Sequence, residues 1–263
     1  MENQEPVVAI SDPGEVGRAA HTAGDRAIIQ ISNVFAWLFP ILMMAIVSQV
    51  ILRQSGFNQA WLDDMQWWLY GSAVLIAIGY AVTTNGHVRV DIFYDNFPAA
   101  KQAKIDCFGL AWLFLPFVIL CWDLTIHYAI ASVASMEGSS SPNGLHNLWI
   151  LKCFMNVSFV FIGAAAWFTY TRRLATLCEP LLWKKLFYAF PSIMFLMNLA
   201  VYYVSWWYIF ATSAEGTTAR DVTRADYFDE IEWGPFETAP SVAIALVLTL
   251  VLIGAARAMA PKS

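Results

Sequence analysis

Few ionisable residues stand inside or beside the long apolar stretches of this sequence, and they are the first candidates for chemistry. They are His87, Arg89 and Asp91; Asp63 and Asp64; and Asp123 and His127. The last two are four residues apart, so a helix would place both on one face. Inside a membrane such a pair can form a proton or ion site, or it can hold helices or subunits together. We expect a structural or subunit contact, because the pair lies toward the outer end of its apolar stretch.

The remaining reactive residues do not form an enzyme-like arrangement. No nucleophile stands with a base, and the cysteines lack the spacing of metal ligands. They are Cys107, Cys121, Cys153 and Cys178. We expect reduced, buried thiols at these four positions. A membrane cytochrome would need paired histidines, but only His127 lies well inside an apolar stretch. The sequence therefore predicts no enzyme, no metal site and no cofactor in this chain.

The elements that must position these residues are membrane-spanning helices. Hydrophobic residues make up 59% of the 263 residues and charged residues 13%, and the mean hydropathy is +0.54. This composition leaves too little polar surface for a water-soluble protein, and a spanning helix needs about 20 mostly apolar residues. Six stretches meet that need: Ile28–Leu52, Gln66–Val82, Ile105–Val133, Leu148–Thr171, Leu186–Thr212 and Pro240–Ala258. We predict an all-α integral membrane protein with six transmembrane helices.

The segments that precede the first two spans differ in character. Residues 1–27 contain prolines, glycines and acids without a basic start and a short apolar core, so we expect a partly disordered cytoplasmic leader and no cleavable signal peptide. Asn58–Gln66 carries Trp61 just before Trp67 and Trp68, and such residues favour the membrane surface. We predict an interfacial helix there, which bends into the second span.

Lysine and arginine set the expected orientation. If the N-terminus is cytoplasmic, eleven of the 15 basic residues lie on the inside and three on the outside, while Lys152 stands at a helix start. The positive-inside rule then places both termini in the cytoplasm. Seven of the 20 acidic residues crowd into one outer loop: Glu215, Asp221, Asp226, Asp229, Glu230, Glu232 and Glu237. An acidic outer face does not suit nucleic acid, so we expect no nucleic-acid partner.

Two polar loops between the spans have unusual sequences. Between the second and third spans, His87, Arg89 and Asp91 alternate with apolar residues, which suits a segment lying flat at the interface. An outer loop between the third and fourth spans contains a turn-forming run of small and polar residues. The run includes Ser139, Ser140, Ser141, Pro142 and Gly144. From composition alone, a solvated connector and an ordinary hairpin turn are the simpler interpretations.

The two loops together are more specific than either alone. The sequence Gly-His-Val-Arg-Val-Asp at Gly86–Asp91, followed one span later by Ser139–Leu145 and then Trp149, resembles the DctQ-like small membrane subunit of tripartite ATP-independent periplasmic (TRAP) transporters. The tryptophan-rich helix with Asp63 and Asp64 is also similar to the pattern of that family. The resemblance covers about Ile28–Ala175. It departs from the family at His146, where a proline is common, and the fifth and sixth spans lie beyond the usual four-helix core.

The resemblance implies a supporting role in secondary transport. In such systems a periplasmic binding protein delivers a substrate, typically an organic acid, to a large (DctM-like) subunit in the bacterial inner membrane. The large subunit holds the sodium and substrate sites, and the small subunit widens its scaffold and helps to dock the binding protein. Residues 28–175 would then be the scaffold core, and residues 176–263 a two-helix extension with an acidic periplasmic loop. His87, Arg89 and Asp91 would anchor the chain among membrane lipids, and Asp63 and Asp64 would be possible subunit contacts. An independent multi-span channel or carrier is the alternative.

Overall fold

The computed structural model describes residues 14, 17–86, 94–214, 216–233 and 236–261, and this part of the chain is almost entirely helical. Its main helices are α1 (Ala23–Ala36), α2 (Leu38–Gln54), α3 (Ala60–Thr84), α5 (Ala99–Phe108), α6 (Leu115–Ala134), α7 (Trp149–Ala175), α8 (Leu182–Tyr188), α9 (Phe190–Thr212) and α11 (Pro240–Ala258). Six helical stretches in this part are long and apolar enough to cross a membrane. The predicted number of spans is therefore confirmed.

The first span, Ala23–Gln54, is longer than its apolar core. It begins with a capping box, in which the Asp25 carboxylate accepts from Thr22 N–H at 2.8 Å and the Thr22 hydroxyl accepts from Asp25 N–H at 3.2 Å. This cap lets the helix start before the expected Ile28. The helix breaks at Trp37, between α1 and α2, because Pro40 has no N–H to offer the carbonyl group four residues earlier.

The second span does not show the separate interfacial helix that we expected over Asn58–Gln66. Instead α3 runs without interruption from Ala60 to Thr84. Its polar first turns are tied to α2, since the Gln49 amide donates to the Asp63 carboxylate and accepts from the Gln66 amide. With those side chains bonded to a neighbouring helix, the polar segment is continuous with the apolar part of α3.

The third span is one continuous helical stretch, Ala99–Ala134, that changes its winding in the middle. A π-helical segment, Gly109–Phe114, joins α5 to α6. Pro116, two residues after this segment, cannot donate a backbone hydrogen bond to the turn before, and such wide turns often accommodate this loss. Trp112 lies within this wider turn.

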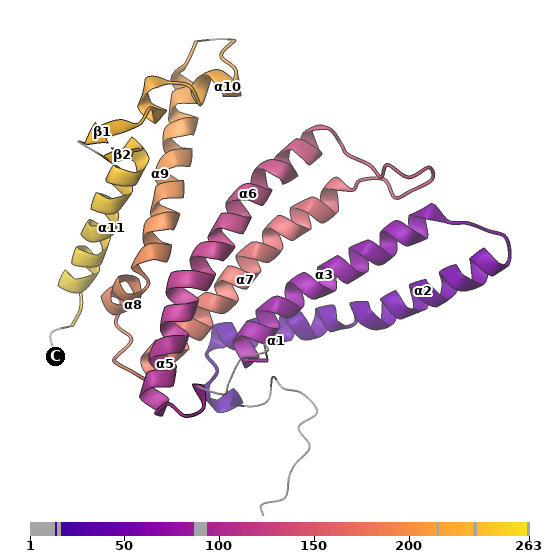
Figure 1. Cartoon of the computed structure of the whole chain (residues 1–263), viewed down its shortest axis with the longest axis horizontal. Coiled ribbons are helices and arrows are strands. Elements are labelled where there is room, and N and C mark those ends of the chain that lie inside the picture. Colours follow the sequence, from indigo (N-terminus) through magenta and orange to yellow (C-terminus); the bar gives the residue numbers. More distant parts are fainter. Residues whose placement is uncertain (1–13, 15–16, 87–93, 215, 234–235, 262–263) are drawn as a thin grey trace, which may run out of the picture.

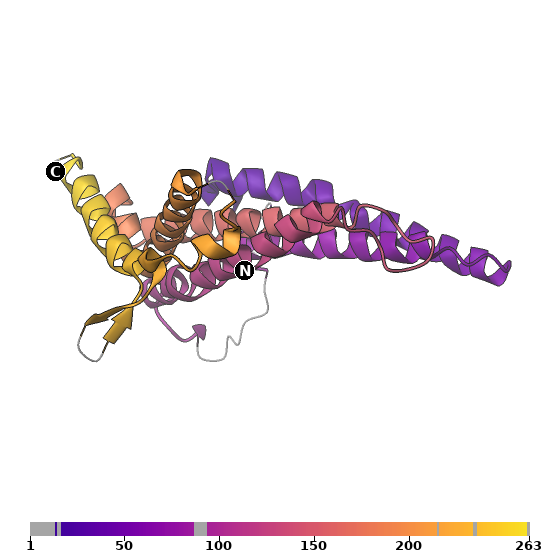
Figure 2. The ribbon, with the colours of Figure 1, turned by 90° about the horizontal axis from the view of Figure 1, so that it is seen from above.

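The helices are arranged as a fan (Figures 1 and 2). α1 and α2 pack against α3, α3 packs against α7, and α7 packs against α6. The helices lie close together at the end that carries α1, α5 and α8, and they spread apart at the opposite end. Small residues allow the close approach: Ala165 and Ala166 are fully buried, and a side chain at Gly79 would collide with the ring of Phe161.

The last two spans form an extension at one edge of the fan. α9 packs against α6 and the π-helical segment, and α11 packs against α9 and α8. The fifth span begins at Phe190 rather than at the expected Leu186, because the chain turns at Ala189 between α8 and α9. Between α9 and α11 the outer loop contains the short helix α10 (Ala219–Val222) and an antiparallel pair, β1 (Ile231–Trp233) and β2 (Phe236–Thr238). This small antiparallel pair is a local addition, and the described part of the chain is otherwise helical, so the predicted all-α class is confirmed.

The start of α1 and the end of α11 lie at the same, closely packed end of the molecule. An even number of spans gives this arrangement. That this end faces the cytoplasm stays a prediction from the distribution of charge.

Candidate functional site

Buried charges join three helices at the closely packed end, which we call the inner end. Arg172, in the last turn of α7, lies with Nη1 3.6 Å from the carboxylate of Asp25, which is fully buried near the start of α1. Its Nη2 donates to the backbone carbonyl of Thr83 at 2.7 Å. Carbonyl groups in the last turn of a helix lack partners within that helix, so this bond also satisfies the end of α3. Arg172 therefore holds α1, α3 and α7 together.

The next residue along α7 makes a second link of the same kind. Arg173 lies with Nε 3.3 Å from the Asp106 carboxylate on α5, and that carboxylate accepts a 2.9 Å hydrogen bond from the Tyr94 hydroxyl. Gln102 in turn donates to the Tyr94 carbonyl at 3.1 Å. The end of α7 thus also fixes the segment that leads into the third span.

At the opposite, outer end, the structure brings together two features that the sequence presented separately. The backbone N–H of Leu145 donates to the Asp64 carboxylate at 2.8 Å, and its carbonyl accepts from Ser139 N–H at 3.0 Å. Gly144 packs against both Ser139 and the Asp64 carboxylate, so closely that a side chain at this position would collide with them. The serine-rich loop is therefore closed on itself and bound to the beginning of α3. We call this contact the outer clasp.

The other members of the serine-rich run face solvent. Ser140, Ser141 and Pro142 are exposed at the tip of the loop. The backbone of Ser141 bonds within the loop, since its N–H donates to the Ser139 hydroxyl at 3.2 Å and its carbonyl accepts from Gly144 N–H at 2.9 Å. The clasp thus presents an exposed polar tip at the outer end of the fan.

Asp63 faces the other way, toward α2. Besides its bond from Gln49, its carboxylate lies 3.8 Å from Arg53 Nη2, in a pair that is largely exposed to solvent. Asp63 and Asp64 therefore attach the same end of α3 to two different neighbours, α2 and the outer loop.

An ion pair joins the outer ends of α6 and α7. Glu137 pairs with Lys152 and accepts a 2.6 Å hydrogen bond from the Ser132 hydroxyl. Lys152 also lies 3.8 Å from the centre of the Tyr128 ring. The hydrogen bond from Lys152, followed by that from Ser132, lowers the pKa of Glu137 below its usual value. The carboxylate is thus held in its charged form where the loop leaves α6.

The ionisable pair within the third span is engaged by the fifth. The Tyr203 hydroxyl on α9 donates to Asp123 at 2.6 Å and lies 3.0 Å from Nε2 of His127. At 1.5 Å per residue, Asp123 lies about 10 Å outward of the middle of its 36-residue helical stretch. The pair therefore connects the extension to the third span in its outer half.

The remaining predicted residues differ in how far the structure describes them. His87, Arg89 and Asp91 lie outside the described residues. In the described part of the chain no three His, Cys, Asp or Glu residues are grouped as a metal site would require. All four cysteines are free, and Cys107 is buried as expected, whereas Cys121, Cys153 and Cys178 are only partly buried. Arg172 and Arg173 were not singled out from the sequence, and the polar surroundings of Asp25 and Asp106 gave no sign that these acids would be their partners.

Comparison with known proteins places this architecture in a family. Residues 42–176 match the family model described as tripartite ATP-independent periplasmic transporters, DctQ component. No curated protein and no solved structure matches the chain. The matched region covers just over half of the chain and extends from α2 to the end of α7, so it includes the outer clasp and both arginines of the inner end. The chain is a multi-pass membrane protein, and it belongs to the DctQ family of TRAP transporter small membrane components.

Proposed function

We propose that this chain is the scaffold subunit of a sodium-driven TRAP transporter that takes up organic acids across the bacterial inner membrane. The DctQ component works with a large DctM component and a periplasmic binding protein. The observation that carries the proposal is the family match over residues 42–176. In this proposal the large subunit binds sodium and substrate, and the present chain holds that subunit in position.

The polar contacts of the chain support a scaffold rather than a transport path. A carrier site would need ionisable groups free to bind a solute or ion near the middle of the membrane. Here Arg172 and Arg173 are each paired with a carboxylate at the inner end, and Asp123 is bonded to the Tyr203 hydroxyl. These side chains join helices to one another, as expected of a part that stays fixed while its partner moves.

The apolar faces of the fan supply surfaces for the large subunit and for lipid. Large apolar side chains are exposed along two separate edges of the molecule. They include Met43, Val47, Val50 and Ile51 on α2, and Val204, Trp207 and Tyr208 on α9. Exposed apolar areas of this extent require a cover of lipid or protein. The α2 edge lies within the family match, so we assign the contact with the large subunit to that edge.

In this proposal the acidic outer loop of the extension helps to dock the binding protein. Asp226, Asp229, Glu230 and Glu232 are all exposed. The loop is anchored to α9, where Phe228 packs on Tyr202 with ring centres 5.2 Å apart and Tyr227 accepts a 3.0 Å hydrogen bond from Ser205. An anchored acidic rim steers a partner with a basic edge and thereby raises the rate of encounter.

Reconstitution in liposomes tests the proposal. We expect uptake of a radiolabelled dicarboxylate or monocarboxylate only when this chain, the large subunit and the ligand-loaded binding protein are all present, and only with an inward sodium gradient. A potassium gradient of equal size is the control. Uptake by liposomes that contain this chain alone would instead favour an independent channel or carrier.

A further inference from the structure

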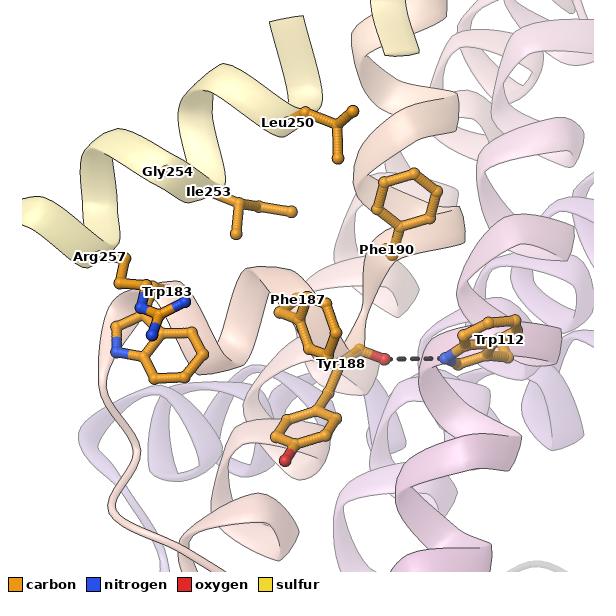
Figure 3. A pocket seen from close by; sticks show the side chains of 9 residues that line it. All are labelled: Trp112, Trp183, Phe187, Tyr188, Phe190, Leu250, Ile253, Gly254 and Arg257. Atoms are coloured by element: carbon orange, nitrogen blue, oxygen red, sulfur yellow. Dashed lines mark hydrogen bonds between the residues drawn. The ribbon is translucent and has the colours of Figure 1, made fainter. Parts of the chain in front are cut away.

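A half-open apolar groove lies at the inner end of the extension, between α8, α11 and the π-helical segment (Figure 3). Its volume is about 650 Å³, within the range of sites that hold small organic molecules. It is lined by Trp112, Trp183, Phe187, Tyr188, Phe190, Leu250, Ile253, Gly254 and Arg257. All of these residues except Trp112 lie beyond residue 176, outside the family match. The groove is therefore a feature of the extension.

The local structure explains why the groove stays open. The chain turns between α8 and α9, which exposes the backbone carbonyl of Tyr188, and the Trp112 indole donates to that carbonyl at 2.8 Å. Without this bond, an unpaired carbonyl would face the lipid at a large energetic cost. On the opposite wall, Gly254 has no side chain, and an added Cβ would meet no atom within 4 Å. The wall of α11 is thus hollow at this point.

Positive charge gathers at one end of the groove. The Arg257 guanidinium lies 5.4 Å from the centre of the Trp183 ring. The Lys184 ammonium lies 5.7 Å from the centre of the same ring. The described lining contains no carboxylate, and no described carboxylate lies within ion-pair distance of Arg257. The groove thus combines an apolar, aromatic body with one lining cation, Arg257, and a second cation, Lys184, lies near the Trp183 ring that lines the same end.

We propose that this groove binds one anionic phospholipid of the inner leaflet. Its acyl chain would lie along Phe187, Phe190 and Ile253, and its phosphate would contact Arg257 and Lys184. Basic pockets between helices on the cytoplasmic side are suited to anionic headgroups, and the inner end is the positively charged end of this chain. A bound lipid would touch α8, α11 and the third span at once, and would so fasten the extension to the core.

Native mass spectrometry of the purified full chain tests this proposal, with phosphatidylglycerol and phosphatidylethanolamine of identical acyl chains as probes. We expect the wild-type chain to retain phosphatidylglycerol in preference. Arg257→Gln should lower that preference about fivefold, since one cation near the surface contributes about a factor of five. Arg257→Lys keeps the charge and should keep the preference. Gly254→Leu should fill the groove and reduce retention of both lipids.

Controls separate this site from general attraction between charges. Lys104→Gln removes an exposed inner cation on α5 and should leave the preference unchanged. Glycerol 3-phosphate at the same concentration should not displace the lipid, since it lacks acyl chains. If Arg257→Gln does not yield folded protein, Lys184→Gln replaces it and should also lower the preference. The proposal is overturned by equal retention of the two lipids in the wild type, by an unchanged preference in the tested glutamine variant, by full retention in Gly254→Leu, or by displacement with glycerol 3-phosphate.

Discussion

The buried pair between Asp25 and Arg172 offers the sharpest test of how the fan is held together. Asp25→Asn removes the charge while an amide oxygen can still accept the capping hydrogen bond from Thr22, so the change isolates the ion pair. Removing one partner of a buried pair costs roughly 3 to 5 kcal/mol, because the other charge remains buried without compensation. The Arg172 side chain is 12% exposed and keeps its bond to the Thr83 carbonyl. We therefore expect the lower limit, about 3 kcal/mol.

The assay is unfolding of the purified chain in mixed detergent micelles, followed by tryptophan fluorescence. Asp25→Asn, Arg172→Gln and the double variant form a thermodynamic cycle, in which direct contact predicts a coupling of about 1 to 3 kcal/mol. Arg53→Gln is the control, since its pair with Asp63 is mostly exposed and should contribute less than about 1 kcal/mol. A loss below about 0.5 kcal/mol in Asp25→Asn, or additive effects of the two changes, would refute the reasoning.

Three further predictions concern the outer end and the extension. Gly144→Ala and Asp64→Ala should both open the outer clasp and speed hydrogen exchange of the Leu145 amide, which donates to Asp64. Gly138→Ala, a position with open space around it, should leave that exchange unchanged. Equal exchange rates in all three variants would contradict the clasp. Tyr203→Phe should lower the free energy of unfolding by about 1 to 3 kcal/mol, because it leaves Asp123 without the hydroxyl that donates to it. Tyr208→Phe, at an exposed position on the same helix, is the control. Equal stability of the two variants would show that the contact does not stabilise the chain. Joint neutralisation of four acids in the outer loop should raise the concentration of binding protein that gives half-maximal uptake, more strongly at low salt. No change at either ionic strength would show that the loop does not take part in docking. The four acids are Asp226, Asp229, Glu230 and Glu232.

Hydropathy located the spans, because lipid allows few alternatives to an apolar helix. The sixth span, Pro240–Ala258, has the predicted bounds, whereas the first begins five residues before Ile28. That difference comes from the capping box at Thr22, whose polar residues lower the hydropathy although they start the helix. The expected interfacial helix was not seen for a similar reason, since the polar turns at the start of α3 are bonded to Gln49.

The links between helices could not be read from the sequence, because they join residues far apart in the chain. Asp64 and Leu145 were noted as parts of separate motifs, and only the fold shows that one donates to the other. Tyr203 attracted no attention, since a tyrosine in an apolar helix is ordinary. Asp123 and His127 were identified from their four-residue spacing, which fixes a shared face but cannot name the helix opposite that face.

The central claim is that this chain serves as the fixed scaffold of a larger transporter, and co-purification tests it most directly. The tagged chain would be extracted in mild detergent from cells that also produce the large TRAP membrane subunit, and the ratio of the two proteins would be measured after size-exclusion chromatography. We predict an equimolar complex whose yield falls when Met43 and Val47 on the α2 edge are both replaced by serine, with Trp207→Ser on the α9 edge as the control. A chain that elutes without the large subunit would contradict the account.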